Sequence, residues 1–296
     1  RKMKPPKFDY FAPDSIESAL TLIAEHGDDA RYLAGGQSLV PMMNFRVAAP
    51  SALIDLNGIA TLRGIKVDKN SRLHIGAMTR TREIEMDSTI ASANPLLHAA
   101  APHIAHIQIR NQGTIGGSLA HADPAAEMPG IVLACNAEIN SIGPAGPRSI
   151  AAGDFFEGIY STALQDGEMI TEIVFPPWPA ARCWAFQEIS RREGDFAMIG
   201  IAAWFDLNET GEISAASLTA IGAGDTPLRL PAAEEILSGQ PPGDVLFAEA
   251  AQAAVNELDP GSDLHASAEY RREVGGVLVE RALKTALQRE APGYTA

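Results

Sequence analysis

Residues 110–129 read RNQGTIGGSLAHADPAAEMP, with three glycines, two small hydroxyl side chains and an Asp-Pro step between two apolar segments. A second glycine turn, AGGQSL at residues 34–39, mixes glycine with hydroxyl and amide side chains in the same way. Glycine permits positive φ and lets a ligand reach the backbone, whose successive N–H groups bind anions, most commonly phosphate. On these residues alone two interpretations stay open: a diphosphate site, or two tight strand-to-helix turns.

The rest of the sequence lacks the common nucleotide, hydrolase and metal signatures. No G-x-G-x-x-G opens a helix after a strand, the chain contains no Gly-Lys pair, and no G-x-S-x-G occurs. Four histidines lie in one region, but their spacing matches no zinc pattern; they are His98, His103, His106 and His121. We therefore predict no metal site and no catalytic residue in this chain.

Composition limits the class of protein. The 296 residues are 46% hydrophobic and 20% charged, which is typical of two or three packed globular units. A net charge of −14 argues against a nucleic-acid partner, because phosphate binding needs clustered Lys and Arg. No apolar run is long enough for a membrane span, and the first residues contain no secretory signal. Together with two cysteines that are far apart in sequence, this predicts a cytoplasmic location.

The order of elements predicts an α+β protein. Residues 13–27 have the pattern of a helix capped by Asp14, followed by a short strand that runs into the first glycine turn. The proline-rich run FPPWPAARCW at residues 175–184 marks a domain boundary. After it, three apolar strands precede three helical patterns. We predict domains at 1–176, with two subdomains split near residue 58, and at 177–296.

Both glycine loops, in order and with their flanks, closely resemble the FAD-binding medium subunits of the molybdenum hydroxylase family. That family includes xanthine dehydrogenase, carbon monoxide dehydrogenase and bacterial N-heterocycle hydroxylases. The resemblance covers nearly the whole chain, including FDYFAPDSIESAL, AFQEISRREGDFA and EYRREVGGVLVERAL. It implies two N-terminal α/β subdomains of the vanillyl-alcohol oxidase-like FAD-binding type, and a C-terminal α+β domain with an antiparallel sheet and helices.

The resemblance also implies which residues hold FAD. Asp123 lies close to Glu127, which stands where the family places an acid on the adenosine ribose. Ile104 and Ile170 occupy positions of apolar contact with the cofactor, and Gln187 falls where some relatives have a lysine near the flavin. That departure leaves the flavin potential and the acceptor open. The diphosphate cradle is implied to consist of Leu33, Ala34, Gly35, Gly36, Gln37, Ser38, Leu39 and Val40 in the first loop, and Thr114, Ile115, Gly116, Gly117 and Ser118 in the second.

The implied activity is electron transfer within a heteromer. In this family a large partner subunit oxidises the substrate at its molybdopterin cofactor, and the [2Fe-2S] clusters of a small partner subunit pass electrons to FAD and on to an external acceptor. The expected assembly is a dimer of heterotrimers. Two cysteines cannot hold a four-cysteine cluster, so the clusters are expected on the partner. Neither the substrate nor the acceptor is identified.

Two other hypotheses remain. One is a self-contained flavin oxidase or reductase of the vanillyl-alcohol oxidase superfamily, for which the C-terminal region offers only His265 and Cys183 as candidate groups. The other is an assembly module that has lost its cofactor, against which the intact glycine loops argue.

Overall fold

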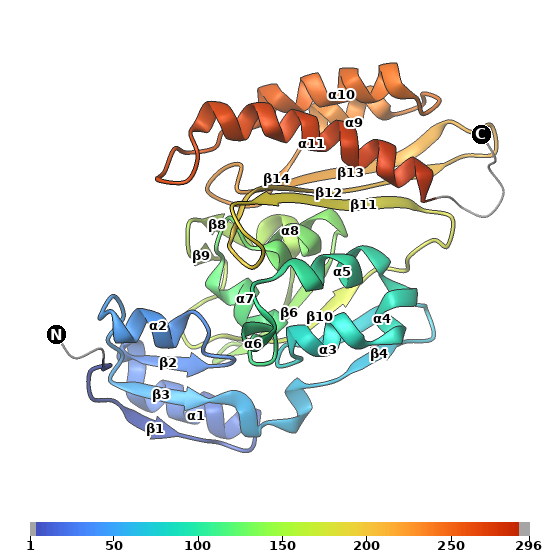
Figure 1. Ribbon diagram of the computed structural model, residues 1–296. Helices are drawn as coiled ribbons and strands as arrows, with labels where there is room; N and C mark the ends of the chain where they lie inside the picture. The colour runs from blue at the N-terminus through green and yellow to red at the C-terminus, as the bar shows by residue number, and fades with distance from the viewer. Residues whose placement is uncertain (1–3, 290–296) are drawn as a thin grey trace.

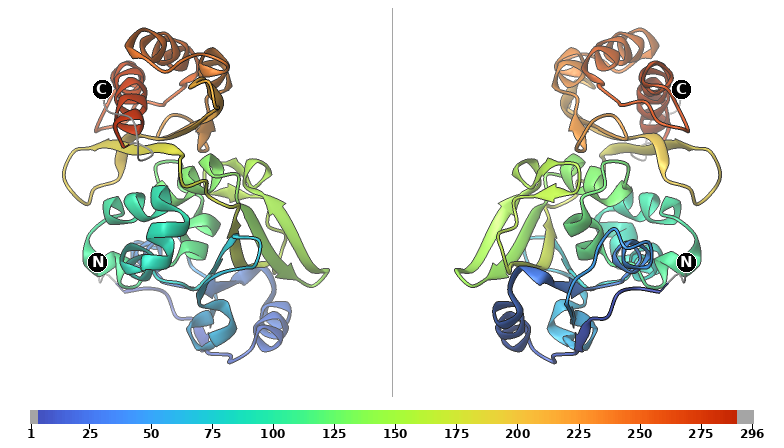
Figure 2. Two further views of the ribbon diagram at one scale, coloured as in Figure 1. Left: turned by 90° about the vertical axis from the view of Figure 1, so that its right-hand side faces the viewer. Right: turned by 90° about the vertical axis from the view of Figure 1, so that its left-hand side faces the viewer.

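The computed structural model describes residues 4–289 and shows three parts stacked in chain order (Figures 1 and 2). The first part is a parallel three-stranded sheet of order β1-β3-β2 with helices beside it. Its first helix begins at Ile16 and is capped by the Ser15 hydroxyl, which accepts from the Ser18 N–H at 3.2 Å; the predicted Asp14 cap is therefore wrong by one residue. The elements are β1 (Asp9–Phe11), α1 (Ile16–His26), β2 (Ala30–Leu33), α2 (Leu39–Asn44) and β3 (Ala52–Asp55).

The middle part pairs an antiparallel five-stranded sheet with six short helices. The sheet order is β4-β5-β10-β6-β7, and the helices are inserted between β5 and β6. The strands are β4 (Ile65–Val67), β5 (Leu73–Gly76), β6 (Glu138–Gly143), β7 (Gly146–Ala151) and β10 (Met169–Phe175), with a small hairpin of β8 (Phe156–Gly158) and β9 (Ser161–Thr162). The helices are α3 (Thr81–Met86), α4 (Ser88–Ala93), α5 (Pro95–Ala100), α6 (Ile107–Arg110), α7 (Ile115–His121) and α8 (Glu127–Ala134).

The third part confirms the predicted order of strands followed by helices. Its antiparallel sheet carries α9–α11 on one face and packs its other face against α5 and α8 of the middle part (Figure 1). Strands buried on both faces read as continuous apolar runs, which is how these strands appear in the sequence. The elements are β11 (Cys183–Ser190), β12 (Ala197–Leu207), β13 (Ile213–Ile221), β14 (Leu228–Arg229), α9 (Pro231–Leu237), α10 (Asp244–Glu257) and α11 (Ala268–Gln288).

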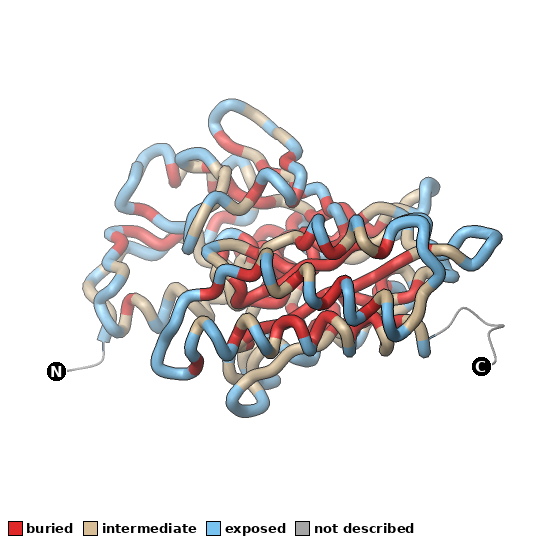
Figure 3. The backbone as a smooth tube through the Cα atoms, turned by 90° about the horizontal axis from the view of Figure 1, so that it is seen from above, coloured by how far each residue is buried: buried red, intermediate tan, exposed pale blue. Residues whose placement is uncertain are grey.

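Successive residues of β11 belong to different hydrophobic cores. Cys183 and Ala185 pack into the core under α10 and α11, whereas Phe186 packs into the core shared with the middle part. Figure 3 shows these buried stretches running through the strands and the inner faces of the helices. The alternation follows from the two-residue period of a strand, and it determines which β11 side chains reach the middle part.

Candidate cofactor-binding site

The first glycine loop, residues 33–40 (loop 1), connects β2 to α2 and leaves a row of backbone donors unused. The N–H groups of residues 35–39 have no acceptor within residues 4–289. Gly36 has φ +70°, a conformation that glycine adopts without strain. A groove of about 350 Å³ lies over this loop; its lining residues are Leu33, Ala34, Gly35, Gly36, Gln37, Val40, Pro41, Asn44, Asn57 and Gln112. Five consecutive free N–H groups beside a groove are the donor set of an anion site.

The second glycine loop, residues 112–118 (loop 2), uses its amides inside the protein. Four consecutive N–H groups have protein acceptors: Ile115 donates to Thr79 O (3.1 Å), Gly116 to Ala77 O (2.9 Å), Gly117 to Thr114 Oγ1 (3.1 Å) and Ser118 to Thr114 O (3.0 Å). Thr114 thereby caps α7. We expected a second row of free amides here. Within the described residues, the donors that loop 2 still offers to a ligand are the Thr114 N–H and the Ser118 hydroxyl. Loop 2 is mainly a packing element.

The two loops touch through glycine. A Cβ atom on Gly35 would lie 2.3 Å from the Gln112 carbonyl oxygen, and one on Gly117 would lie 3.4 Å from the Ala34 Cβ. Asn57 Nδ2 donates to the Ala34 carbonyl at 3.0 Å, which holds loop 1 from the other side. Loop 2 therefore sets the position of loop 1, and side chains at Gly35 would push the loops apart.

The two acidic candidates lie beyond loop 2 and do not line the groove. Asp123 accepts from the Ala125 N–H at 2.9 Å and from the Tyr160 hydroxyl at 3.4 Å. Glu127 is the first residue of α8 and is buried. Burial raises its pKa to about 8, and repulsion from Glu188 adds to the rise. A carboxyl group that is protonated near neutral pH is a hydrogen-bond donor. The contact of Glu127 with the ribose, with Asp123 close by, stays a prediction.

Ile104 and Ile170 pack against the same core. Ile170 is buried on β10 and Ile104 is partly buried. Next to Ile104, the His103 ring stands 5.2 Å from the Phe186 ring and its Nδ1 lies 3.3 Å from Glu188 Oε1. The C-terminal domain thus reaches the segment that carries Ile104.

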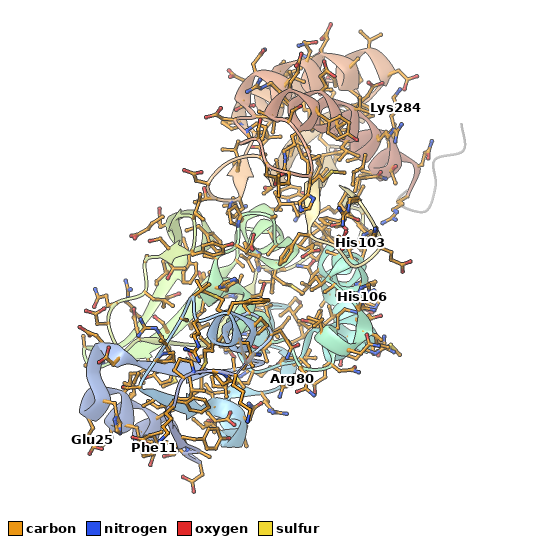
Figure 4. The ribbon with its side chains drawn as sticks, turned by 60° about the vertical axis from the view of Figure 1, so that its left-hand side comes forward. Phe11, Glu25, Arg80, His103, His106 and Lys284 are labelled. Carbon is orange, nitrogen blue, oxygen red and sulfur yellow. The ribbon has the colours of Figure 1, made fainter. Side chains whose placement is uncertain are left out.

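The hairpin between β11 and β12 covers the same segment. A Cβ atom on Gly194 would lie 2.2 Å from the His106 ring, so the hairpin backbone rests on that histidine. Figure 2 shows the hairpin beside the helices of the middle part, and Figure 4 labels His103 and His106 on the side that meets it. Neither contact was evident from the sequence, because it joins residues about a domain apart.

Gln187 points away from this region. Its Nε2 donates to Thr285 Oγ1 of α11 at 3.3 Å, on the helix-covered face of β11. Its neighbours Phe186 and Glu188 point to the middle part instead. Because neighbouring strand residues face opposite sides of a sheet, Gln187 lies on the other face from these two residues, and its position beside the flavin stays a prediction. Glu188 is the polar β11 side chain that faces the middle part, and the strand period would have identified it.

The described residues show neither a metal-binding cluster nor a membrane-spanning helix. Among residues 4–289, no three His, Cys, Asp or Glu side chains gather in a way that could hold a metal ion. No helix in that range is both long enough and apolar enough to cross a membrane.

The chain is similar to known proteins over nearly its whole length. The family described as FAD binding domain in molybdopterin dehydrogenase matches residues 6–178, and the CO dehydrogenase flavoprotein C-terminal domain matches residues 184–286. The chain is 44% identical to subunit alpha of the 6-hydroxypseudooxynicotine dehydrogenase complex of Paenarthrobacter nicotinovorans, over 98% of each chain. It is 38% identical to caffeine dehydrogenase subunit beta of Pseudomonas sp. (strain CBB1), over 97% of each chain.

A solved structure gives the same result. A chain of carbon monoxide dehydrogenase from Hydrogenophaga pseudoflava superimposes with a TM-score of 0.94 and 39% identity, covering 97% of this chain and 100% of that one. Both the sequence and the three-part fold are therefore shared over full length. The chain belongs to the FAD-binding medium subunits of the molybdenum hydroxylase family, which are parts of oxidoreductases, and its cofactor is FAD.

Proposed function

We propose that this chain receives electrons on FAD from the iron–sulfur clusters of a small partner subunit and passes them to an external acceptor. The substrate is oxidised at the molybdopterin cofactor of a large partner subunit. The relatives reported above support this assignment, because both are named as subunits of dehydrogenases. The flavin supplies the redox chemistry, and this chain supplies binding and orientation.

The observation that carries the proposal is the row of free amides in loop 1. FAD has a diphosphate, and an anion of that size needs several donors at one place. Residues 35–39 provide five N–H groups, and the Ser38 hydroxyl has no partner within the described residues. We assign the diphosphate to this row, with the Thr114 N–H and the Ser118 hydroxyl as further donors from loop 2.

The partner subunits hold the other redox centres in this proposal. The chain has two cysteines, Cys135 and Cys183, both buried and on separate elements. A [2Fe-2S] cluster needs four ligands, usually cysteines, so the clusters are assigned to the small subunit. The dimer of heterotrimers and the cytoplasmic location stay predictions.

Substrate choice does not follow from this chain. The relatives' names refer to substrates as different as carbon monoxide and the N-heterocycles caffeine and 6-hydroxypseudooxynicotine. Similar medium subunits thus occur in enzymes that are named for different substrates. This is expected if the medium subunit performs a step that these enzymes share, such as electron transfer through FAD.

Anaerobic reduction of the flavin tests the proposal. The full chain, purified alone, should be yellow, and its flavin should stay oxidised when organic substrates are added. The chain purified with its partner subunits should contain molybdenum and iron, and its flavin should bleach on addition of the complex's substrate. A chain that oxidises an alcohol or aldehyde by itself would instead be a self-contained flavoenzyme. A colourless chain that takes up no FAD would be an assembly module.

A further inference from the structure

Arg80 stands directly before α3, and its guanidinium group binds two carbonyl oxygens, one from each of two residues that line the groove. Its Nη1 donates to the Gln112 carbonyl of loop 2, and its Nη2 donates to Asn57 Oδ1. Both Gln112 and Asn57 line the groove over loop 1, whereas Arg80 does not. Arg80 therefore contacts two residues that line the groove without lining it itself.

Asn57 carries the connection from Arg80 to loop 1. Its Nδ2 donates to the Ala34 carbonyl at 3.0 Å and to Asp55 Oδ1 at 2.6 Å, and its backbone N–H donates to the same Asp55 oxygen at 2.9 Å. The amide oxygen is occupied by Arg80 and, at 3.4 Å, by Arg63 Nη2. Asn57 has both amide ends engaged, so a change at Arg80 is transmitted to the backbone of loop 1.

The other end of the connection is the contact between the loops. The Gln112 carbonyl that Arg80 binds is the atom that a Cβ on Gly35 would strike at 2.3 Å. Arg80 thus holds the oxygen against which Gly35 is packed. Figure 4 shows Arg80 where the first part of the chain meets the middle part. One guanidinium group ties both glycine loops together across two parts of the fold.

The geometry of the guanidinium matters more here than its charge. Glu83 Oε2 accepts from the Arg80 backbone N–H at 2.7 Å, and Asp55 also lies close enough to attract the guanidinium. Arg63 adds a second positive charge nearby. These charges offset one another in part. A planar fork that reaches two acceptors at once is something that lysine cannot supply.

We propose that Arg80 is a positioning residue for FAD: by holding Asn57 and Gln112, it keeps loop 1 and loop 2 at the spacing that the diphosphate requires. The proposal rests on the assignment of the diphosphate to loop 1. It predicts that Arg80 substitutions weaken FAD binding although Arg80 does not line the groove.

FAD titration of the full-length apoprotein tests the proposal with Arg80→Gln and Arg80→Lys. We expect FAD affinity to fall at least about tenfold in both variants, because lysine restores the charge and not the fork. Affinity for ADP, which carries the diphosphate without the flavin, should fall by the same factor. Hydrogen exchange of the Val40 amide, which donates to the Gly36 carbonyl at 3.0 Å within loop 1, should become faster in the apoprotein, although Val40 is far from Arg80 in sequence.

Arg82→Gln is the matched control, because Arg82 lies in α3 just after Arg80 and, within the described residues, forms its ion pair with Glu85, at 2.6 Å. It should bind FAD as the unchanged protein does. An Arg80→Gln protein within about twofold of that affinity would overturn the proposal, and so would a loss of FAD affinity without a loss of ADP affinity.

A second variant distinguishes failure of the loop 1 assignment from failure of the proposed role of Arg80. Gly36→Val should abolish FAD binding if loop 1 holds the diphosphate. If it does so while Arg80→Gln binds FAD normally, the loop assignment stands and the role of Arg80 is wrong. If Gly36→Val retains full FAD affinity, the loop assignment itself is wrong and the inference about Arg80 falls with it.

Discussion

The two glycine loops look alike in sequence and do different work in the structure. Loop 1 leaves five consecutive amides without an acceptor in the described residues, whereas four consecutive loop 2 amides are bonded to Ala77, Thr79 and Thr114. Glycine in loop 1 leaves the backbone open beside the groove in which we propose that the diphosphate binds. Glycine in loop 2 lets a helix pack closely on the strand end beside it. The comparison shows that a glycine pattern alone does not tell which loop keeps its backbone amides free.

The largest expected effect comes from Gly36→Val in loop 1. The φ of +70° is unfavourable for a β-branched residue, so the loop must change its backbone conformation. FAD affinity should fall by roughly 100-fold or more, which corresponds to about 2.8 kcal/mol. Fluorescence titration of the apoprotein measures this. Gly211→Val, at φ +82° in a turn with open space around it, is the matched control and should bind FAD normally.

Gly116→Ala should affect the fold first. The new Cβ would lie 2.6 Å from the Ala77 Cβ and 2.8 Å from the Ala77 carbonyl oxygen, both on backbone or short side chain that cannot move aside. Overpacking of this kind costs about 1–3 kcal/mol, measured as the free energy of unfolding in urea. Gly153→Ala, with nothing within 4 Å, should leave that free energy unchanged. A Gly116→Ala protein with full stability and weak FAD binding would show that loop 2 is a ligand loop after all.

The buried Glu127 carboxyl group should make the free energy of unfolding depend on pH. Its pKa is about 8 in the folded chain and near 4.5 in the unfolded chain, so between these values the folded state holds a proton that the unfolded state has released. The free energy of unfolding should therefore fall as pH rises through this window, by up to about 1.4 kcal/mol per pH unit. Glu127→Gln keeps the neutral shape and should flatten this dependence, whereas Glu157→Gln on an exposed residue should not. An unchanged slope in Glu127→Gln would mean that another group titrates.

The smallest effects are expected from removing one hydroxyl group in each loop, at Thr114 and at Ser38. Thr114→Ala removes the cap of α7 and should lower the free energy of unfolding by about 1 kcal/mol. Ser38→Ala should change that free energy by less than about 0.5 kcal/mol, because the Ser38 hydroxyl makes no bond in the described residues. It should weaken FAD binding instead. If both variants lost stability equally, the contrast between the loops would fail.

Several features could be predicted because they depend on local chemistry. Long apolar runs followed by helical patterns predicted the C-terminal sheet and its helices, and the two glycine loops with their flanks identified the family. The helix cap was misplaced because Asp14 and Ser15 both suit a cap, and only the extended backbone of Ser15 decides between them. The contact of Gln187 with α11 could not be predicted, because the face that a strand residue takes depends on register, and neighbouring residues face opposite sides.

The sequence by itself determined the family, the cofactor and the positions of the two glycine loops, because these follow from residue types in a fixed order. Only the tertiary structure decided which loop keeps its amides free. Two of the four loop 2 amides donate to Ala77 and Thr79, which follow β5 and come well before loop 2 in the chain, whereas the other two donate to Thr114 within the loop. The same holds for Arg80, whose two acceptors meet only when the first and middle parts pack together. Hydrogen bonds between distant segments depend on how the chain folds back on itself, and no local pattern records them.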